Sequence, residues 1–398
     1  MKRIVYISVL LALVALNGAA QNISGSWSGV LEMEDTRIPF VYNITADGRC
    51  TIDSPSEKVR NIPGDVDYLS PDSLCISTSI GFVYAGRLQD GVIHGTFTQN
   101  QVSVPMDLCP VHRPQTPQPP FPYHTELVKF TNANAGATLA GTLSVPEGAK
   151  CVLLMVTGSG LENRDEELFG HKPFAVIADR LARQGIATLR YDDRAYGESV
   201  GGDVMGATTS DFADDAAAGI EWLRRSGRFQ QVGILGHSEG GAIAFMLGAQ
   251  GLVDFIVSLA GPAVQGDSIL LEQCRIVTPE LAENLTIEVL HRDPRIQQNP
   301  WYNFFMNYNP QTDIAATACP VMAVNGENDC QVPAEMNLSA MRRFLRPNER
   351  HLIKSYPGLN HLFQHCETGL PDEYDVIEET FSEEVINDII NWIKILNH

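Results

Sequence analysis

Short runs in which apolar and polar residues alternate fill the first part of the chain, and turn-forming residues separate them. This alternation is typical of strands with one buried face, and the segment has no helical periodicity. The tripeptide Gln89-Asp90-Gly91 is typical of a turn between two strands. The pattern predicts a small antiparallel β barrel or sandwich over residues 21–112, with strands at 27–33, 38–44, 50–52, 73–77, 82–86 and 92–97.

A proline-rich segment follows at residues 113–122. Its sequence is Arg-Pro-Gln-Thr-Pro-Gln-Pro-Pro-Phe-Pro, and proline cannot donate the backbone hydrogen bonds of a strand or a helix. Segments of this composition are stiff and extended. We interpret this segment as a linker between the β domain and a second domain at 123–398.

In the second domain, apolar strand-like runs alternate with segments of helical periodicity. The runs 126–130 and 138–145 suggest an antiparallel hairpin, and further strands are expected at 151–156, 186–190, 232–236, 255–260, 321–325 and 351–355. Helices are expected at 173–184, at 242–249, at 381–396 and in a segment that ends at Ser226, with Ser210 as its N-cap. Repeated strand–helix units predict an α/β fold, a mostly parallel sheet with helices on both faces.

The alternation stops between about residues 266 and 317. This segment has helical fragments at 269–277 and 279–291 and an aromatic cluster at 301–308, but no apolar strand. We interpret it as a helical lid inserted over the carboxyl edge of the sheet. The alternative is a helical excursion that only covers the core.

The segment Gly236–Gly240, with the sequence Gly-His-Ser-Glu-Gly, lies where an apolar run turns into a helix-forming run. The G-x-S-x-G pattern in this context is typical of a nucleophilic serine. Glycine at both ends removes Cβ atoms that would collide in so sharp a turn, and the helix directs free N–H groups at the serine. We therefore predict that Ser238 is a nucleophile. A glycine-rich turn with an incidental serine is the alternative.

A nucleophilic serine needs a general base, and the base needs a third group that orients it. Asp329 comes just after the predicted strand at 321–325, and His361 comes after the strand at 351–355. The chain order serine, aspartate, histidine, with each residue at a carboxyl strand end, is the order expected for this architecture. The sequence thus predicts a catalytic triad of Ser238, Asp329 and His361.

Three other residues compete for these roles. Glu327 could replace Asp329 as the acid, and His365 lies one helical turn beyond His361. His237 adjoins Ser238, but consecutive side chains in a tight turn diverge, so it is not expected to face the serine.

Acyl transfer also needs two backbone donors for the oxyanion. The first is expected from Glu239, which follows the nucleophile, and the second from Ser159 or Gly160, in the loop after the strand at 151–156. Gly-x-Gly after a strand also occurs in dinucleotide-binding folds. That alternative is disfavoured, because the third glycine is absent and the acidic segment 161–167 stands where the pyrophosphate would bind.

The chain carries 48 acidic and 28 basic residues and a formal net charge of −20. Such a surface repels phosphate backbones and anionic lipid, so a nucleic-acid partner is not expected. The eight cysteines show no CxxC or other ligand spacing, and no metal site or cofactor is expected. In an exported protein they could form disulfides, and Cys330 with Cys366 is one open pairing.

The first twenty residues have the parts of a secretory signal peptide. Lys2 and Arg3 precede an apolar run at 4–16, and small residues at 18–20 come before Gln21. The apolar run is shorter than the roughly 20 residues that span a bilayer. The pattern predicts secretion or a periplasmic location, cleavage after residue 20 and no stable membrane insertion afterwards.

Four motifs together resemble secreted bacterial α/β-hydrolase esterases: the elbow at 236–240, the loop at 158–166, the turn at 192–199 and the segment Asn-His-Leu-Phe-Gln at 360–364. The likeness covers residue 125 to the end. It implies an α/β-hydrolase fold, the same triad, and loop-bracing roles for Arg164 and Arg194. The N-terminal β domain is similar to a lipocalin-like module found on some of these enzymes. Thr157 and Ala195 depart from residues common in the family.

These observations predict a serine carboxylesterase that acts on small-molecule esters of short to medium acyl groups through an acyl-enzyme. The first alternative is a serine peptidase on the same fold, with lid glutamates (Glu272, Glu280, Glu283 and Glu288) near the peptide amino terminus. The second is a carbohydrate- or lipid-binding protein without catalysis. The sequence leaves the oligomeric state and the natural ester open.

Overall fold

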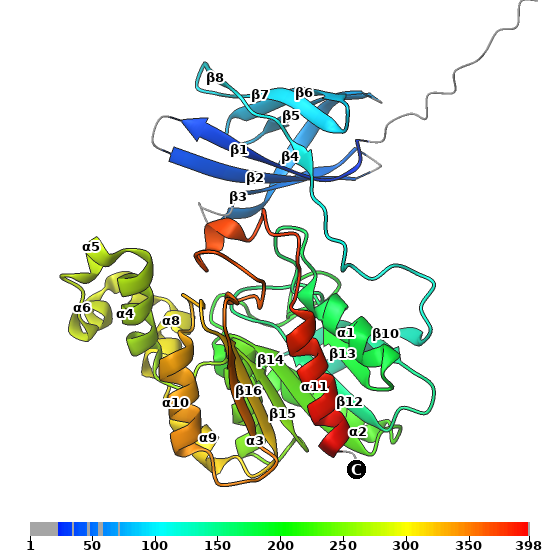
Figure 1. Cartoon of the computed structure of the whole chain (residues 1–398), viewed down its shortest axis with the longest axis vertical. Helices are drawn as coiled ribbons and strands as arrows, with labels where there is room; N and C mark the ends of the chain where they lie inside the picture. Colours follow the sequence, from blue (N-terminus) through cyan, green and yellow to red (C-terminus); the bar gives the residue numbers. More distant parts are fainter. Residues whose placement is uncertain (1–22, 34–35, 46–47, 55–58, 71, 397–398) are drawn as a thin grey trace, which may run out of the picture. The chain divides into compact units, whose positions relative to one another are not determined.

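The computed structural model describes residues 23–33, 36–45, 48–54, 59–70 and 72–396. The predicted signal peptide lies outside the described residues. The chain divides into two compact units, residues 1–111 and 112–398 (Figure 1). Each unit has its own buried apolar core. No helix among the described residues is long and apolar enough to cross a membrane.

The described residues of the first unit form an antiparallel sheet of nine strands in the order β8-β7-β6-β5-β4-β3-β2-β1-β9. A bridge between Leu108 and Ile93 of β7 links the segment before β9 to the other side of the sheet, so the sheet closes into a barrel. The predicted all-β domain is confirmed, and β4, β8 and the two-residue β9 are strands that the pattern missed. The bounds are β1 Gly25–Met33, β2 Thr36–Ile44, β3 Cys50–Ser54, β4 Val59–Ser70, β5 Ser73–Thr78, β6 Phe82–Gln89, β7 Val92–Gln99, β8 Val102–Pro105 and β9 Cys109–Pro110.

The second unit is built on an eight-stranded sheet in the order β10-β11-β13-β12-β14-β15-β16-β17. β10 and β11 form an antiparallel hairpin. In the rest of the sheet, the neighbours β13, β12, β14, β15, β16 and β17 pair in parallel. The predicted α/β architecture is therefore confirmed. The bounds are β10 His124–Asn132, β11 Ala137–Val145, β12 Cys151–Val156, β13 Ala187–Tyr191, β14 Gln231–His237, β15 Ile256–Leu259, β16 Val321–Gly326 and β17 Leu352–Tyr356.

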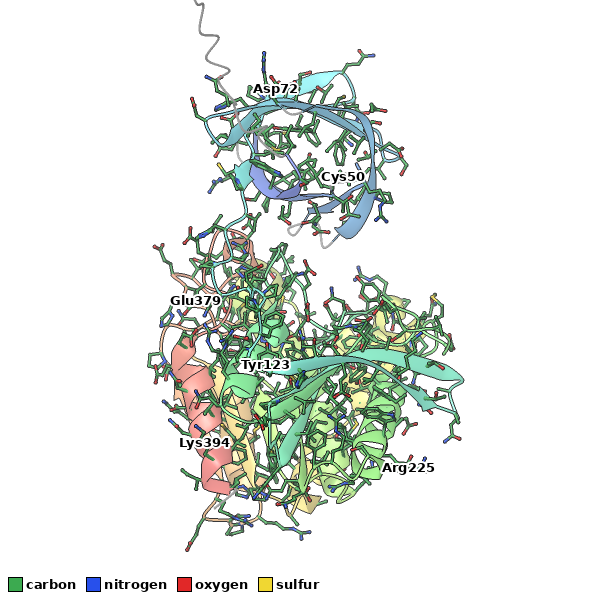
Figure 2. The ribbon with its side chains drawn as sticks, turned by 90° about the vertical axis from the view of Figure 1, so that its right-hand side faces the viewer. Cys50, Asp72, Tyr123, Arg225, Glu379 and Lys394 are labelled. Atoms are coloured by element: carbon green, nitrogen blue, oxygen red, sulfur yellow. The ribbon has the colours of Figure 1, made fainter. Side chains whose placement is uncertain are left out.

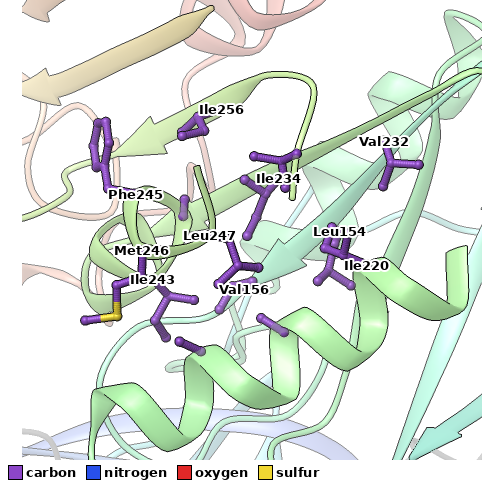
Figure 3. Packing of buried hydrophobic residues seen from close by; sticks show 14 of the residues in the cluster. Leu154, Val156, Ile220, Val232, Ile234, Ile243, Phe245, Met246, Leu247 and Ile256 are labelled. Atoms are coloured by element: carbon purple, nitrogen blue, oxygen red, sulfur yellow. The ribbon is translucent and has the colours of Figure 1, made fainter. Parts of the chain in front are cut away.

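Helices cover both faces of this sheet. The side chains of β12 alternate between two cores, with Leu154 and Val156 in one and Leu153 and Met155 in the other. The first core contains residues of α2 Thr209–Arg225 and α3 Glu239–Ala249 (Figure 3). It also contains residues of α10 Ala334–Phe344. The second contains residues of α1 Pro173–Arg183 and α11 Glu383–Leu396. Burial on both faces explains why these strands are continuous apolar runs.

Two details differ from the sequence predictions. The N-cap of α2 is Thr208 and not Ser210, because Thr208 and Asp211 form a capping box in which the Thr208 amide donates to Asp211 Oδ2 at 2.9 Å. Helix α10 was not expected.

The insertion between β15 and β16 is helical, as predicted. Its helices are α4 Gly266–Val277, α5 Pro279–Ala282, α6 Ile287–Arg292, α7 Pro294–Gln298, α8 Pro300–Asn307 and α9 Pro310–Ala316. Four of them begin with proline, whose fixed φ suits the first helical position and whose missing N–H costs nothing there. The prolines thus divide the segment into short helices.

Candidate active site

Ser238 lies alone between the end of β14 and the start of α3. Its backbone has φ 52° and ψ −118°, a sparsely populated conformation for a residue with a side chain. A Cβ on Gly236 would lie 1.9 Å from the Gly240 carbonyl oxygen, and one on Gly240 would lie 2.2 Å from that of Val156. The two glycines are thus required by the turn that holds the serine.

Asp329 and His361 come together from the loops after β16 and β17. His361 Nδ1 lies 2.7 Å from Asp329 Oδ2, and both side chains are buried. The other carboxylate oxygen, Oδ1, accepts the amide N–H groups of Gln331 and Val332, each at 2.8 Å. These two bonds fix the carboxylate, which in turn fixes the imidazole ring and the tautomer with a proton on Nδ1.

The competing acid and base lie elsewhere. Glu327 is exposed and accepts a hydrogen bond from the Ser355 hydroxyl at 2.7 Å. His365 is also exposed, and its Nδ1 contacts Glu379 Oε2. The geometry therefore pairs His361 with Asp329 and with neither alternative.

The predicted oxyanion donors lie in the loop after β12 and at the start of α3, on either side of Ser238 in the chain. A Cβ on Gly158 would lie 3.4 Å from the Ser238 Cβ, so the loop after β12 runs directly beside the serine. The Gly158 amide itself donates to Glu166 Oε1 at 2.9 Å, which leaves Ser159 and Gly160 as the next amides along the loop. Glu239 occupies the first position of α3, where a helix amide has no partner within the helix.

A buried pair that the sequence reasoning did not assign, Glu166 with His237, connects these loops. His237 Nδ1 lies 2.8 Å from Glu166 Oε1, and its Nε2 lies 2.9 Å from the carbonyl oxygen of His361. Both ring nitrogens therefore face acceptors, an environment that suits the doubly protonated imidazolium. Because Glu166 Oε1 also binds the Gly158 amide, the pair ties the oxyanion loop, the serine turn and the His361 loop together. Its only sequence signal is the acidic run after a strand end.

The environment of His237 also sets its charge. Burial alone lowers the pKa of His237, but the charge and hydrogen bond of Glu166 and the His361 carbonyl outweigh burial and raise it to about 8. At neutral pH the ring is therefore mostly cationic, and the Glu166–His237 contact is an ion pair within the core.

This pair predicts a pH dependence of stability. The pKa of His237 in the folded chain lies above its unfolded value of roughly 6.5. The ion pair therefore stabilises the fold fully below that pH, and this contribution is lost as the pH rises through about 8. We expect the unfolding free energy of the second unit to lose about 2 kcal/mol from this pair between pH 6 and pH 9 in urea titrations. Glu166→Gln should flatten this slope, and Glu379→Gln, at the exposed pair with His365, should not. Equal slopes in wild type and Glu166→Gln would contradict the assignment.

The Glu239 carboxyl group joins the serine turn to the helical insertion. Its Oε1 accepts the Thr209 hydroxyl at 2.6 Å and the indole N–H of Trp301, in α8, at 2.7 Å. The Trp301 ring stacks on Phe305. Burial raises the pKa of Glu239, although the hydrogen bonds from Thr209, Trp301 and Ser159 oppose the rise.

The two arginines singled out in the sequence brace loops. Arg164 binds both carboxylate oxygens of Asp192, through Nε at 2.9 Å and Nη2 at 2.6 Å. Arg194 is buried and its Nε lies 2.7 Å from Asp215 Oδ2.

All eight cysteines are free, including Cys330 and Cys366, whose open pairing the structure does not form. Within the described part of the chain, no cluster of three or more His, Cys, Asp or Glu side chains could hold a metal ion.

Comparison with known proteins finds relatives among hydrolases. A family model described as Hydrolase_4, "Serine aminopeptidase, S33", matches residues 172–319. The chain is 25% identical over 271 residues to esterase EstD of Thermotoga maritima, an alignment that covers 64% of this chain and 65% of that protein. It is 26% identical over 243 residues to a monoacylglycerol lipase of Mycolicibacterium smegmatis, covering 54% of this chain and 81% of the lipase.

Two solved structures are among those similar to the chain. Esterase Pf2001 of Pyrococcus furiosus has 16% identity and a TM-score of 0.47, and the match covers 71% of this chain and 96% of that one. Est1E from Butyrivibrio proteoclasticus has 17% identity and a TM-score of 0.47, with coverage of 67% and 99%.

Proposed function

We propose that this chain, whose second unit has the α/β-hydrolase fold, is a serine carboxylesterase that cleaves esters of short to medium acyl groups through an acyl-enzyme. The observation that carries the proposal is the buried contact between Asp329 and His361 at the carboxyl edge that also holds the strained Ser238. The esterase and lipase relatives support a carboxylic ester hydrolase.

In the proposed mechanism, His361 takes the proton of the Ser238 hydroxyl as the oxygen attacks the ester carbonyl carbon. The amide N–H groups of Glu239 and of Ser159 or Gly160 stabilise the oxyanion. His361 then gives its proton to the leaving alcohol, and the acyl group stays on Ser238. Water, activated by His361, releases the carboxylic acid and restores the serine.

The acyl-group preference rests on the aromatic helix α8. Trp301 and Phe305 belong to this helix, and Trp301 contacts the carboxyl group of the residue next to Ser238. Apolar rings this close to the nucleophile favour an apolar acyl or alkoxy group over a charged one. The chain requires no cofactor for this chemistry.

The test is hydrolysis of p-nitrophenyl esters of short and medium acyl chains by wild type and Ser238→Ala. We expect the variant to lose activity by at least about 10⁴-fold, because no other group supplies the nucleophile. Ser339→Ala, an exposed serine on α10, should keep wild-type activity. A burst of p-nitrophenol before steady turnover would report the acyl-enzyme.

A serine peptidase remains the second candidate, because the matching family model bears the description of an aminopeptidase. The lid glutamates expected to hold a peptide amino terminus form no buried site. Glu280, Glu283 and Glu288 are exposed, and Glu272 pairs with Arg275. Aminoacyl p-nitroanilides in the same panel decide between esterase and peptidase. Cleavage of these amides with no ester turnover would replace the esterase proposal with the peptidase. Inactivity on both substrate classes would favour a binding protein.

A further inference from the structure

The barrel of the first unit contains an open cavity of about 490 Å³. The described residues that line it include the ends of β1, β3 and β7, at Met33, Ser54 and Gln99, and the starts of β4 and β8. Among the described segments, the turns between β5 and β6 and between β7 and β8 lie at this end, at Ile80 and Asn100. The cavity therefore lies at one end of the barrel.

The other half of the barrel interior is filled by side chains. Tyr84 is fully buried, and its hydroxyl donates towards the carbonyl oxygens of Ile93 and Met106 at 3.1 and 3.0 Å. Cβ atoms on Gly86 and Gly95 would lie 3.0 and 2.3 Å from this hydroxyl, so glycine at both positions makes room for the ring. Figure 2 shows side chains directed into the barrel. The packed side chains thus close the floor of the cavity on this side.

The wall of the pocket is apolar and aromatic. Phe40, Phe82 and Phe97 line it, with ring centroids 4.9 to 5.8 Å apart, and Leu31 and Ile62 complete the wall. Pockets of roughly 300–1,000 Å³ with such walls and a few polar groups are typical of small-molecule sites, and barrel mouths are a usual place for them. The size and the wall both suit an apolar ligand.

One polar group in the pocket has no partner. Ser54 is buried at the end of β3, and its hydroxyl makes no hydrogen bond with any described residue. An unpartnered buried hydroxyl costs free energy that a ligand acceptor or donor would recover. Gln99 and Asn100 line the same end. The polar groups are therefore confined to the mouth, and the floor is apolar.

The rim of the mouth is also apolar. Within the described part of the first unit, the large apolar side chains that are exposed are Met33, Val59, Ile80 and Val102, with 41 to 62% of their surface accessible, and all four line the cavity. Exposed apolar groups that gather around an opening, and are not scattered singly, mark an interaction site. Together they give the ligand an apolar entrance.

We propose that the barrel binds a single-chain amphiphile, with its unbranched alkyl or acyl chain in the pocket and its polar end at the mouth beside Ser54. The separation of the apolar floor from the polar groups of the mouth selects a molecule with one polar end. The flexible chain fits a pocket at one end of the barrel. This site is independent of Ser238 and goes beyond the proposed esterase activity.

The test is calorimetric titration of the full chain carrying Ser238→Ala with 1-hexanol, 1-octanol and 1-decanol, which are uncharged chains with one polar end. Each pair of added methylenes should strengthen binding by about 15-fold until the pocket is full. Leu31→Trp fills the pocket and should weaken 1-octanol binding by at least tenfold. Absence of binding, or affinity that does not depend on chain length, would overturn the proposal.

A second pair of variants guards against misfolding of Leu31→Trp and against binding elsewhere. Ile80→Asn removes an exposed rim side chain, and Leu127→Asn makes the same change at an exposed leucine of β10 in the second unit. Ile80→Asn should weaken binding several-fold, whereas Leu127→Asn should leave it unchanged. Equal affinity with the native barrel, with Ile80→Asn and with Leu31→Trp, all in the Ser238→Ala chain, would assign the bound chain to the second unit and overturn the proposal.

Discussion

Asp329→Asn is expected to lower kcat for ester hydrolysis by about 10⁴-fold, because it reverses one hydrogen bond of the proposed triad. In the native chain, Asp329 Oδ1 accepts two backbone amides and Oδ2 faces His361 Nδ1. An asparagine keeps its oxygen on the two amides, so its NH₂ group faces His361. The imidazole must then carry its proton on Nε2, where it cannot accept the proton of Ser238.

The matched control is Glu327→Gln, which changes the alternative acid two residues away. Its exposed carboxylate contacts Ser355 and not His361, so we expect kcat within about twofold of wild type. Steady-state rates on one p-nitrophenyl ester, with circular dichroism to verify folding, make the comparison. A large loss in Glu327→Gln with normal activity in Asp329→Asn would reassign the acid.

Arg194→Met is expected to destabilise the second unit by about 3–5 kcal/mol, because it leaves a buried carboxylate without its cation. Arg194 and Asp215 are nearly inaccessible to solvent, and Asp215 Oδ1 also accepts the side-chain amide of Asn132 at 2.8 Å. The Arg194 Nη2 donates to the carbonyl oxygen of Asp211 at 2.6 Å, so the substitution removes a bond to the start of α2 as well. The midpoint of urea unfolding of this unit measures the loss.

Arg225→Met is the control for this prediction. Arg225 lies at the end of α2 (Figure 2) and pairs with Glu221. The side chains of Arg225 and Glu221 are 77% and 60% exposed. Exposed pairs of this kind contribute less than about 1 kcal/mol. Similar losses in the two variants would mean that burial does not set the strength of the Arg194 pair.

The elements that the sequence predicted well are those with a local cause. Buried strands such as β12 are continuous apolar runs, and the Ser238 turn needs glycines at two fixed spacings, which a linear pattern displays. Strand β4 was missed because Pro63 and Gly64 interrupt its alternation, so its pairing is set by neighbouring strands that no local window contains. Helix α10 was overlooked although its buried residues Ala334, Leu338 and Met341 recur at helical spacing.

The residues of the candidate site also differ in whether the sequence could predict them. The order of Ser238, Asp329 and His361 follows from strand order, and the structure brings Asp329 and His361 into contact, but their catalytic role stays a prediction until the variants are assayed. The pairing of Glu166 with His237 spans 71 residues and depends on how two loops fold against each other, so no spacing rule reveals it. Ala195, noted as a departure from glycine, has φ 55°, which explains why glycine suits that turn.

The contact between Trp301 and Glu239 makes the position of α8 and the charge next to Ser238 mutually dependent. The indole N–H favours the ionised carboxylate, whereas burial, the larger effect, favours the protonated acid, so withdrawal of α8 would change the pKa of Glu239. Thermodynamic reciprocity then requires that the protonation state of Glu239 change the attachment of α8 by the same factor. Binding of a ligand that displaces this helix is therefore coupled to a change in the proton occupancy of Glu239, and its affinity varies with acidity even if the ligand itself does not titrate.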